Sequence, residues 1–210
     1  MLILAKRKNY LNLNHMRGEL FGMPCVGKSS VLVNVASLAE LNPCRIEASI
    51  VGKSLNIFLG LCFNPKLILF IFQDYKFWSM RGIWRKYLIL FERLGRLLRT
   101  DEIIVDEGPL QASWALFYDR SRCDDNKEAF VRLLSIVNVC EVSFHVSAEY
   151  KDYLKFLSSR ARKHPLSFAS ADDLKKAESW MNEMVSIQRD TIGTNLQTYT
   201  NIWSHQHVDR

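Results

Sequence analysis

Several common sequence signatures are absent from this chain of 210 residues, and each absence narrows its class. Glycine and proline are scarce, at 9 and 5 residues, which excludes a collagen-like or low-complexity chain. The 5 cysteines are scattered, without a C-x-x-C pair or a Cys/His ligand spacing. Neither a disulfide framework nor a zinc site is therefore indicated, and we expect a reducing, cytoplasmic environment.

Long apolar runs are also lacking. The longest apolar stretch, residues 55–72, is interrupted by Asn64-Pro65-Lys66, and each half is too short to span a bilayer. We expect two core or surface-docking helices in this stretch, with the Phe and Leu side chains mainly in the core, and no membrane span. Residues 1–15 place their charges after the apolar residues, which is not the order of a signal peptide. We interpret them as a leader before a single domain at 16–210, with either Met1 or Met16 as the start.

The composition that is present is that of a basic globular protein. Hydrophobic residues make up 48% and charged residues 24% of the chain, and the formal net charge is +6. This charge suits an anionic partner, whether phosphate, nucleotide, nucleic acid or membrane surface. Because the basic residues are spread out and no aromatic RNA-stacking motif is found, we expect no specific nucleic-acid binding.

The most specific motif is Gly22-x-x-x-x-Gly27-Lys28-Ser29, which matches the phosphate-loop pattern G-x-x-x-x-G-K-[ST]. A short apolar strand precedes it, and helical periodicity over residues 30–39 follows. In such a loop the backbone N–H groups and the helix N-terminus bind phosphate, the lysine reaches the β- and γ-phosphate oxygens, and the serine hydroxyl coordinates Mg²⁺. The residues predicted to bind nucleotide are Gly22, Cys25, Val26, Gly27, Lys28, Ser29 and Ser30.

A partial copy of this motif occurs at Val51-Gly52-Lys53-Ser54. The first glycine of the pattern would fall at position 47, where the chain has Glu47. Because a carboxylate at that position would repel phosphate, we interpret the copy as a surface turn rather than a second nucleotide site.

A second candidate element is the apolar run Ile103-Ile104-Val105, which ends in Asp106-Glu107 and is broken by Gly108-Pro109. An aspartate at the tip of a strand beside a phosphate loop holds Mg²⁺ directly or through water, so Ser29 and Asp106 are the predicted metal ligands. Glu107 is a candidate general base or a group that positions the acceptor.

Two arginine pairs are further candidates. Arg160 and Arg162 lie in a basic segment, where positive side chains on a mobile lid would neutralise charge on a transferring phosphoryl group. Arg120 and Arg122 follow the Asp106-Glu107 element and would bind a second phosphate or an acidic acceptor. Both pairs stay hypotheses, because basic loops are usually solvated surface.

Strand and helix patterns alternate along the rest of the chain, which favours a parallel α/β sheet. The expected elements are a short strand within 43–50, two or three helices in 54–99, a helix at 110–118, a strand at 137–146, a helix to about 159, a helix at 172–189 capped by Ser170, and an edge strand within 195–203.

Taken in order, these parts resemble the nucleoside monophosphate kinase branch of P-loop proteins, the thymidylate and adenylate kinase-like group, over residues 16–190. The resemblance implies a three-layer α/β fold with a five-stranded parallel sheet in the order 2-3-1-4-5, flanked by helices. It also implies a helical acceptor region at about 50–99 and a small lid at about 160–172. In that group an arginine usually follows the strand-end acid, whereas this chain has Glu107 after Asp106.

The same resemblance implies a phosphotransferase that uses ATP and Mg²⁺. The γ-phosphoryl group would pass to a nucleoside monophosphate or a similar small molecule, and a homodimer is left open. The implied catalytic residues are Lys28, Glu107, Arg160 and Arg162, with Arg120 and Arg122 at the acceptor.

Three alternatives stay open from the sequence. One is an ATPase in which Glu107 polarises water, another is a nucleotide-gated binding module with little turnover, and the third is a sulfotransferase-like protein. A GTPase is not indicated, because the nearest match to Asn-Lys-x-Asp, at residues 126–129, lacks the aspartate. A transporter ATPase subunit is not indicated either, because the chain has no Leu-Ser-Gly-Gly-Gln.

Overall fold

The computed structural model describes residues 17–24, 26–39, 42–44, 49–73, 82–99, 103–118, 126–159, 170–192 and 195–200. Within these residues the order of elements is β1-α1-β2-α2-α3-α4-β3-α5-α6-β4-α7-α8-β5. The alternation of strands and helices confirms the α/β class. The leader at 1–15 lies outside the described residues.

The strands pair into one parallel sheet with the spatial order β2-β3-β1-β4-β5, which is the order that the resemblance implied. Their bounds are β1 Arg17–Gly22, β2 Asn42–Cys44, β3 Ile103–Val105, β4 Val142–Ser147 and β5 Asn195–Thr200. Because β1 is central and all its pairings are parallel, the carboxyl ends of β1, β3 and β4 meet at one edge of the sheet.

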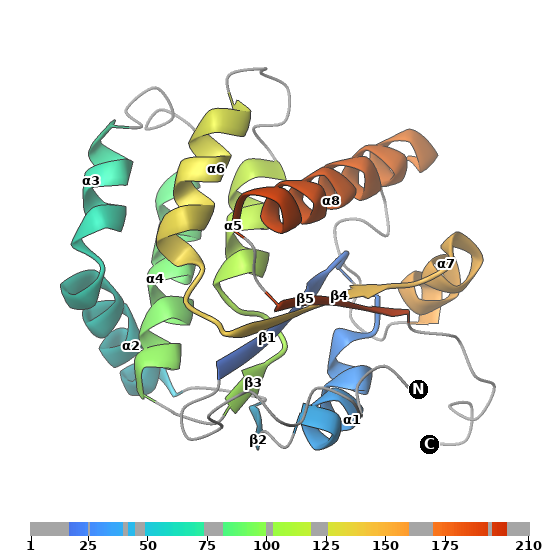
Figure 1. Cartoon of the computed structure of the whole chain (residues 1–210), viewed down its shortest axis with the longest axis horizontal. Helices are drawn as coiled ribbons and strands as arrows, with labels where there is room; N and C mark the ends of the chain where they lie inside the picture. The colour runs from blue at the N-terminus through green and yellow to red at the C-terminus, as the bar shows by residue number, and fades with distance from the viewer. Residues whose placement is uncertain are drawn as a thin grey trace.

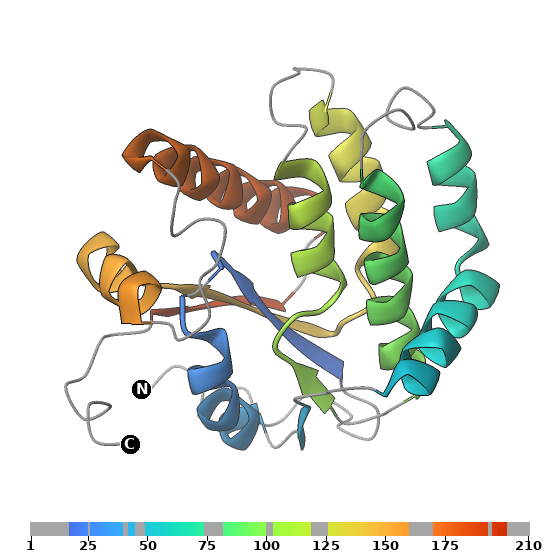
Figure 2. The same cartoon turned by 180° about the vertical axis from the view of Figure 1, so that it is seen from behind.

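Helices cover both faces of this sheet, as an all-parallel sheet requires. Helix α1 lies on one side, and α5 and α8 lie on the other (Figures 1 and 2). Helices α2 and α3 lie outside α4, at the edge of the molecule in both views. The helix bounds are α1 Lys28–Ala39, α2 Ile50–Phe63, α3 Pro65–Gln73, α4 Ile83–Arg99, α5 Pro109–Tyr118, α6 Asn126–Val137, α7 Tyr150–Ser159 and α8 Ala171–Ile192.

Local sequence explains where several helices begin. Proline, which suits the first helical position, starts α3 and α5. The backbone N–H of Gly52 donates to Oγ of Ser49 at 3.1 Å, capping α2. At α8 the N–H of Asp173 donates to Oγ of Ser170 at 3.1 Å, and that hydroxyl donates to the Asp173 carboxylate at 2.7 Å. The predicted cap at Ser170 is thus confirmed.

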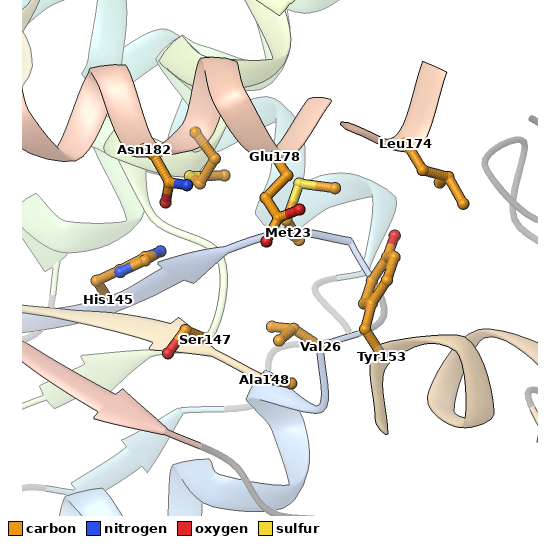
Figure 3. A pocket seen from close by; sticks show the side chains of 10 residues that line it. Met23, Val26, His145, Ser147, Ala148, Tyr153, Leu174, Glu178 and Asn182 are labelled. Atoms are coloured by element: carbon orange, nitrogen blue, oxygen red, sulfur yellow. The ribbon is translucent and has the colours of Figure 1, made fainter. Parts of the chain in front are cut away.

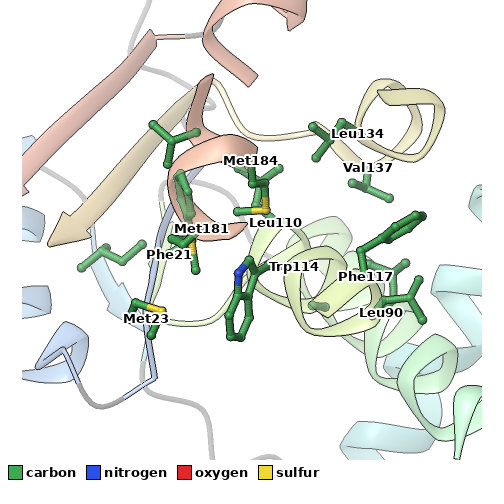
Figure 4. Close-up of a cluster of buried hydrophobic side chains, with 14 of the residues drawn as sticks. Phe21, Met23, Leu90, Leu110, Trp114, Phe117, Leu134, Val137, Met181 and Met184 are labelled. Atoms are coloured by element: carbon green, nitrogen blue, oxygen red, sulfur yellow. The ribbon is translucent and has the colours of Figure 1, made fainter. Parts of the chain in front are cut away.

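The main core lies between the sheet and helices α5, α6 and α8. Leu20 and Phe21 are successive residues of β1, and both are fully buried, so this strand is covered on its two faces. The aromatic ring of Phe130 on α6 contacts Phe117 and Trp180, with ring centroids 5.1 and 5.4 Å apart. Figure 4 shows Met181 and Met184 of α8 filling the space beside Phe21, Leu110 and Trp114.

Two expected boundaries are wrong. Strand β4 begins at Val142 rather than at 137, because residues 126–137 form the helix α6. The buried residues Ala129, Phe130, Leu133, Leu134 and Val137 recur at helical spacing and form the packed face of α6. The partial motif copy at 51–54 is not a turn but part of α2, although it is on the surface as expected, with Lys53 exposed.

The contact between α2 and α4 also differs from expectation, because the buried residues of α2 are Asn56 and Gly60, while Ile57 and Leu61 are only partly buried against the core. Gly60 lies in α2 and Gly95 in α4, and because neither has a side chain the two backbones approach closely. A Cβ on Gly95 would lie 1.8 Å from the carbonyl oxygen of Asn56. The side chain of Asn56, 2% exposed, donates to Oε1 of Glu92 at 3.2 Å. Glu92 Oε1 also accepts from Arg96 at 2.7 Å.

The apolar stretch 55–72 is therefore only partly in the core. Leu67, Phe70 and Ile71 of α3 are buried, whereas Phe58 and Phe63 of α2 are exposed. No single helix in the described ranges has both the length and the apolar composition to cross a membrane. The pair α2 and α3 meets those criteria only jointly, with a bend of 82° between the two helices.

Gly95→Ala tests the close helix contact. The added methyl group would overlap the Asn56 carbonyl, so we expect the free energy of unfolding to fall by about 1–3 kcal/mol, although alanine is the better helix former. Urea denaturation measures the change. The control Ser54→Ala, at an exposed position of α2, should stay within about 0.5 kcal/mol of the parent. Equal stability of Gly95→Ala and the parent would contradict the contact.

Candidate functional site

The candidate site begins where the central strand ends. Strand β1 stops at Gly22, and α1 starts six residues later at Lys28. Gly27 has a φ of 83°, a left-handed conformation that glycine adopts without strain, and the backbone then enters the helix. The loop is thus followed directly by the positive end of a helix, on which anions are stabilised.

Lys28 is held against this loop. Its side chain is buried, and its Nζ donates to the carbonyl oxygens of Gly22 at 3.2 Å and of Met23 at 3.1 Å. The ammonium group therefore lies directly over the loop backbone, which is where the motif predicts a phosphate-binding cation. Ser30, in the first turn of α1, is exposed.

Ser29 and Asp106 meet, although they are 77 residues apart in the chain. The Ser29 hydroxyl donates to Oδ2 of Asp106 at 2.8 Å. Asp106 directly follows β3, which pairs with β1, so the parallel register brings the strand-end carboxylate to the first turn of α1. A hydroxyl and a carboxylate are the hard oxygen ligands that Mg²⁺ prefers, so the predicted metal pair fits that ion in its chemistry.

Glu107, one residue further, points to a different partner. Nη2 of Arg93 on α4 donates to Oε2 of Glu107 at 3.0 Å, and the Glu107 side chain is 51% exposed. The same arginine lies 3.5 Å from Oε2 of Glu92. Glu107 is therefore linked to α4, within the predicted acceptor region.

Gln111 and Glu19, which lie outside the sequence motifs, join β1 to the start of α5. The backbone N–H of Gly22 donates to Oε1 of Gln111 at 3.0 Å. The N–H of Leu110 donates to Oε2 of Glu19 at 3.1 Å. A signal for both is present in the sequence, because each is a polar residue within an otherwise apolar segment.

The Glu19 carboxyl is fully buried, with no exposed surface. Burial raises its pKa to about 8, and the hydrogen bond from Leu110 opposes this in part. In the structure described, its second oxygen, Oε1, has no hydrogen-bond partner. Glu19 is therefore mainly protonated in the folded protein at neutral pH, beneath the loop that the sequence predicts to bind phosphate.

A pocket lies beside the loop, between the end of β4 and helices α7 and α8 (Figure 3). Met23 and Val26 of the loop supply part of its apolar lining, and Ala148, Leu174 and Met181 supply the rest. Its polar residues come from three elements: His145 and Ser147 on β4, Tyr153 on α7, and Glu178 and Asn182 on α8. Burial lowers the pKa of His145 to about 4, and the positive charges of Lys28 and Arg189 add to this effect, so the imidazole is neutral at neutral pH.

No protein-family model matches the sequence, and no curated protein matches it. Solved structures do match the fold. Deoxyadenosine kinase from M. mycoides with bound dATP is 13% identical, with a TM-score of 0.52 over 88% of this chain and 91% of that chain. Thymidylate kinase from Candida albicans is 12% identical, with a TM-score of 0.54 over 90% and 84%. The chain has a nucleoside monophosphate kinase-like P-loop fold.

This kinase-like fold accounts for the common edge at which the loop, Asp106 and the β4 end meet. The structure brings together Gly22, Val26, Gly27, Lys28, Ser29 and Asp106, and it directs Glu107 toward α4. Five further predicted site residues lie outside the described ranges, namely Cys25, Arg120, Arg122, Arg160 and Arg162. The same is true of most of the predicted lid, residues 160–169.

Glu19→Gln tests the buried carboxyl. Between pH 4.5 and about 8 the unfolded chain releases the Glu19 proton and the folded kinase-like domain keeps it. The folded state then binds more protons, so the contribution of Glu19 to stability is fully present below pH 4.5 and declines as pH rises toward 8, by up to about 1.4 kcal/mol per pH unit. In urea titrations, we expect the free energy of unfolding of Glu19→Gln to increase relative to that of the parent as pH rises across this range.

The control for this experiment is Glu128→Gln, at an exposed carboxylate on α6. A pH trend shared by both variants would not come from burial of Glu19. A pH-independent difference for Glu19→Gln would mean that Glu19 is ionised in the folded protein.

Proposed function

We propose that this protein is a phosphotransferase that binds ATP with Mg²⁺ and transfers the γ-phosphoryl group to a small-molecule acceptor. The observation that carries the proposal is the 2.8 Å hydrogen bond between Ser29 and Asp106, beside the loop on which Lys28 lies. The loop motif by itself supplies one of the proposed metal ligands, Ser29. Asp106, at the end of the adjacent strand, supplies the second, and a phosphate loop beside a metal-binding aspartate is the combination that phosphoryl transfer requires.

The roles follow from the positions of the residues. The backbone of Gly22, Val26, Gly27 and Ser30, with that of Cys25, would bind the phosphates, and Ser29 and Asp106 would hold Mg²⁺. The ion, when bound, neutralises charge that develops on the phosphate oxygens. Lys28 would exchange its two carbonyl contacts for phosphate oxygens and stabilise the same charge. Arg160 and Arg162 are proposed to close over the phosphates.

The acceptor is proposed to be a nucleoside monophosphate or a similar small molecule. Two of the structural neighbours are named deoxyadenosine kinase and thymidylate kinase, which supports testing nucleosides and their monophosphates first. In the proposed acceptor region at 50–99, α4 is the helix that reaches the site, through the Arg93–Glu107 ion pair. Glu107 would orient the acceptor, and Arg120 and Arg122 would bind its charge.

An ATPase is the second candidate, because adjacent Asp106 and Glu107 are also suited to hold Mg²⁺ and polarise a water molecule. The ion pair with Arg93 favours the kinase, since it directs Glu107 toward α4 in the proposed acceptor region. The two functions differ in one measurable property, which is whether release of ADP depends on an acceptor.

Lys28→Ala tests the proposed transfer. Removing the buried ammonium should lower acceptor-dependent ADP release by about a hundredfold or more, as for the loss of a preorganised charge donor. ADP release from MgATP is measured with and without nucleosides, nucleoside monophosphates and sugars. The matched control is Lys53→Ala, in the exposed partial copy of the motif, which should leave turnover unchanged.

Release that depends on one acceptor class and is lost in Lys28→Ala supports the kinase and identifies that class. Steady release without any acceptor supports the ATPase. Absence of both ATP binding and ADP release by the parent protein contradicts both functions.

Glu107→Gln tests whether that residue acts on the acceptor. If Glu107 orients or deprotonates the acceptor, the substitution should lower turnover by about 10²–10⁴-fold while ATP affinity changes little. Arg93→Ala should change the Michaelis constant for the acceptor, because it removes the partner that holds Glu107 toward α4. Steady-state kinetics with the acceptor found above measure both effects. Unchanged turnover in Glu107→Gln would remove this residue from the mechanism.

A further inference from the structure

Helices α2 and α3 expose large apolar side chains at the edge of the molecule (Figures 1 and 2). Six of these side chains are each at least 60% exposed: Ile50, Val51, Phe58, Phe63, Leu69 and Phe72. We define these six as the α2–α3 face. The hydrophobic effect opposes such a concentration of exposed apolar surface in water, and patches of this kind usually mark an interaction site.

The packing of α2 explains why this face is outward. The side that α2 turns to α4 carries the small residue Gly60 and the polar Asn56, which joins Glu92 and also accepts from Arg99 at 3.0 Å. In a helix of a water-soluble protein the apolar stripe normally packs inward. Here small residues and polar hydrogen bonds join the two helices, as they do when helices associate in lipid, and of the apolar residues Ile57 and Leu61 pack partly against the core. The apolar stripe Val51, Leu55 and Phe58 is left outside.

The charges on these helices have one sign. Residues 49–73 include no Asp or Glu, and their charged residues are Lys53 and Lys66, both exposed. Lys66 shares the outer side of α3 with Leu69 and Phe72, because the three recur at intervals of three residues. One exposed lysine on each helix, without an acidic residue and beside an exposed apolar stripe, matches an anionic lipid surface, which attracts lysine and accepts apolar side chains below the headgroups.

We propose that the α2–α3 face docks on the surface of an anionic lipid bilayer. The bend of 82° and the short helices suit a pair that lies in the interface rather than one that spans it. A second copy of the same face would add two further lysines and no acidic residue to the contact, whereas anionic lipid compensates the charges of Lys53 and Lys66. Docking leaves the phosphate loop accessible, because α2 and α3 lie on the far side of α4 from the end of β1 in both views.

The test is co-sedimentation of the full chain with vesicles of pure phosphatidylcholine and with vesicles of equal phosphatidylcholine and phosphatidylserine. We expect binding to the anionic vesicles that weakens as salt rises. The double variant Phe58→Ser with Phe63→Ser should lower the partition coefficient by about tenfold or more. Lys53→Glu with Lys66→Glu should lower it by a similar factor on anionic vesicles and little on neutral ones.

The matched control is Val33→Ser with Leu154→Ser, which removes two exposed apolar side chains on α1 and α7. It should bind vesicles as the parent does. Thermal unfolding and ATP binding of every variant, compared with the parent, separate lost docking from lost folding. Three results would overturn the proposal: no binding of the parent to anionic vesicles, equal binding of the Phe58/Phe63 variant, or dissociation of a dimer by that variant in sedimentation velocity without any vesicle binding.

Discussion

The parallel pairing of β1 with β3 and β4 is the constraint on which the proposed site depends. It places three strand ends at one edge, so that the loop after Gly22, the carboxylate of Asp106 and the end of β4 become neighbours. The Ser29–Asp106 hydrogen bond is a direct consequence of that register. A shift of β3 or β4 along β1 would separate these groups, because only the pairing of the strands brings these distant parts of the sequence together.

Buried polar side chains also stabilise this edge of the sheet through hydrogen bonds. Gln111 and Glu19 tie the first turn of α5 to β1, through Gly22 and Leu110 respectively. A buried ionised carboxylate would be costly, so Glu19 takes up a proton instead, and its pKa rises to about 8. The phosphate loop thus rests on a neutral acid rather than on a negative charge that would oppose an anionic ligand.

The α2–α4 contact shows a different balance of forces. Gly60 and Gly95 permit close backbone approach, and hydrogen bonds join Asn56 to Glu92, Arg96 to Glu92 and Arg99 to Asn56. Ile57 and Leu61 of α2 pack partly against the core, whereas Val51, Leu55 and Phe58 are exposed. The exposed side chains belong to the surface proposed to dock on lipid, which lies away from the phosphate loop.

The sequence by itself determined the class of fold, the loop at 22–29, the strand-end Asp106 and the cap at Ser170, because each depends on residue types at short, fixed spacing. It did not reveal α6, the roles of Gln111 and Glu19, or the outward apolar face of α2. These depend on which distant segment lies opposite each residue. Asn56 is buried because Glu92 accepts its hydrogen bond, and Glu19 is protonated because α5 covers it. Only the tertiary structure decides such partners, because the pattern of polar and apolar residues in the sequence does not indicate which distant residue each side chain contacts.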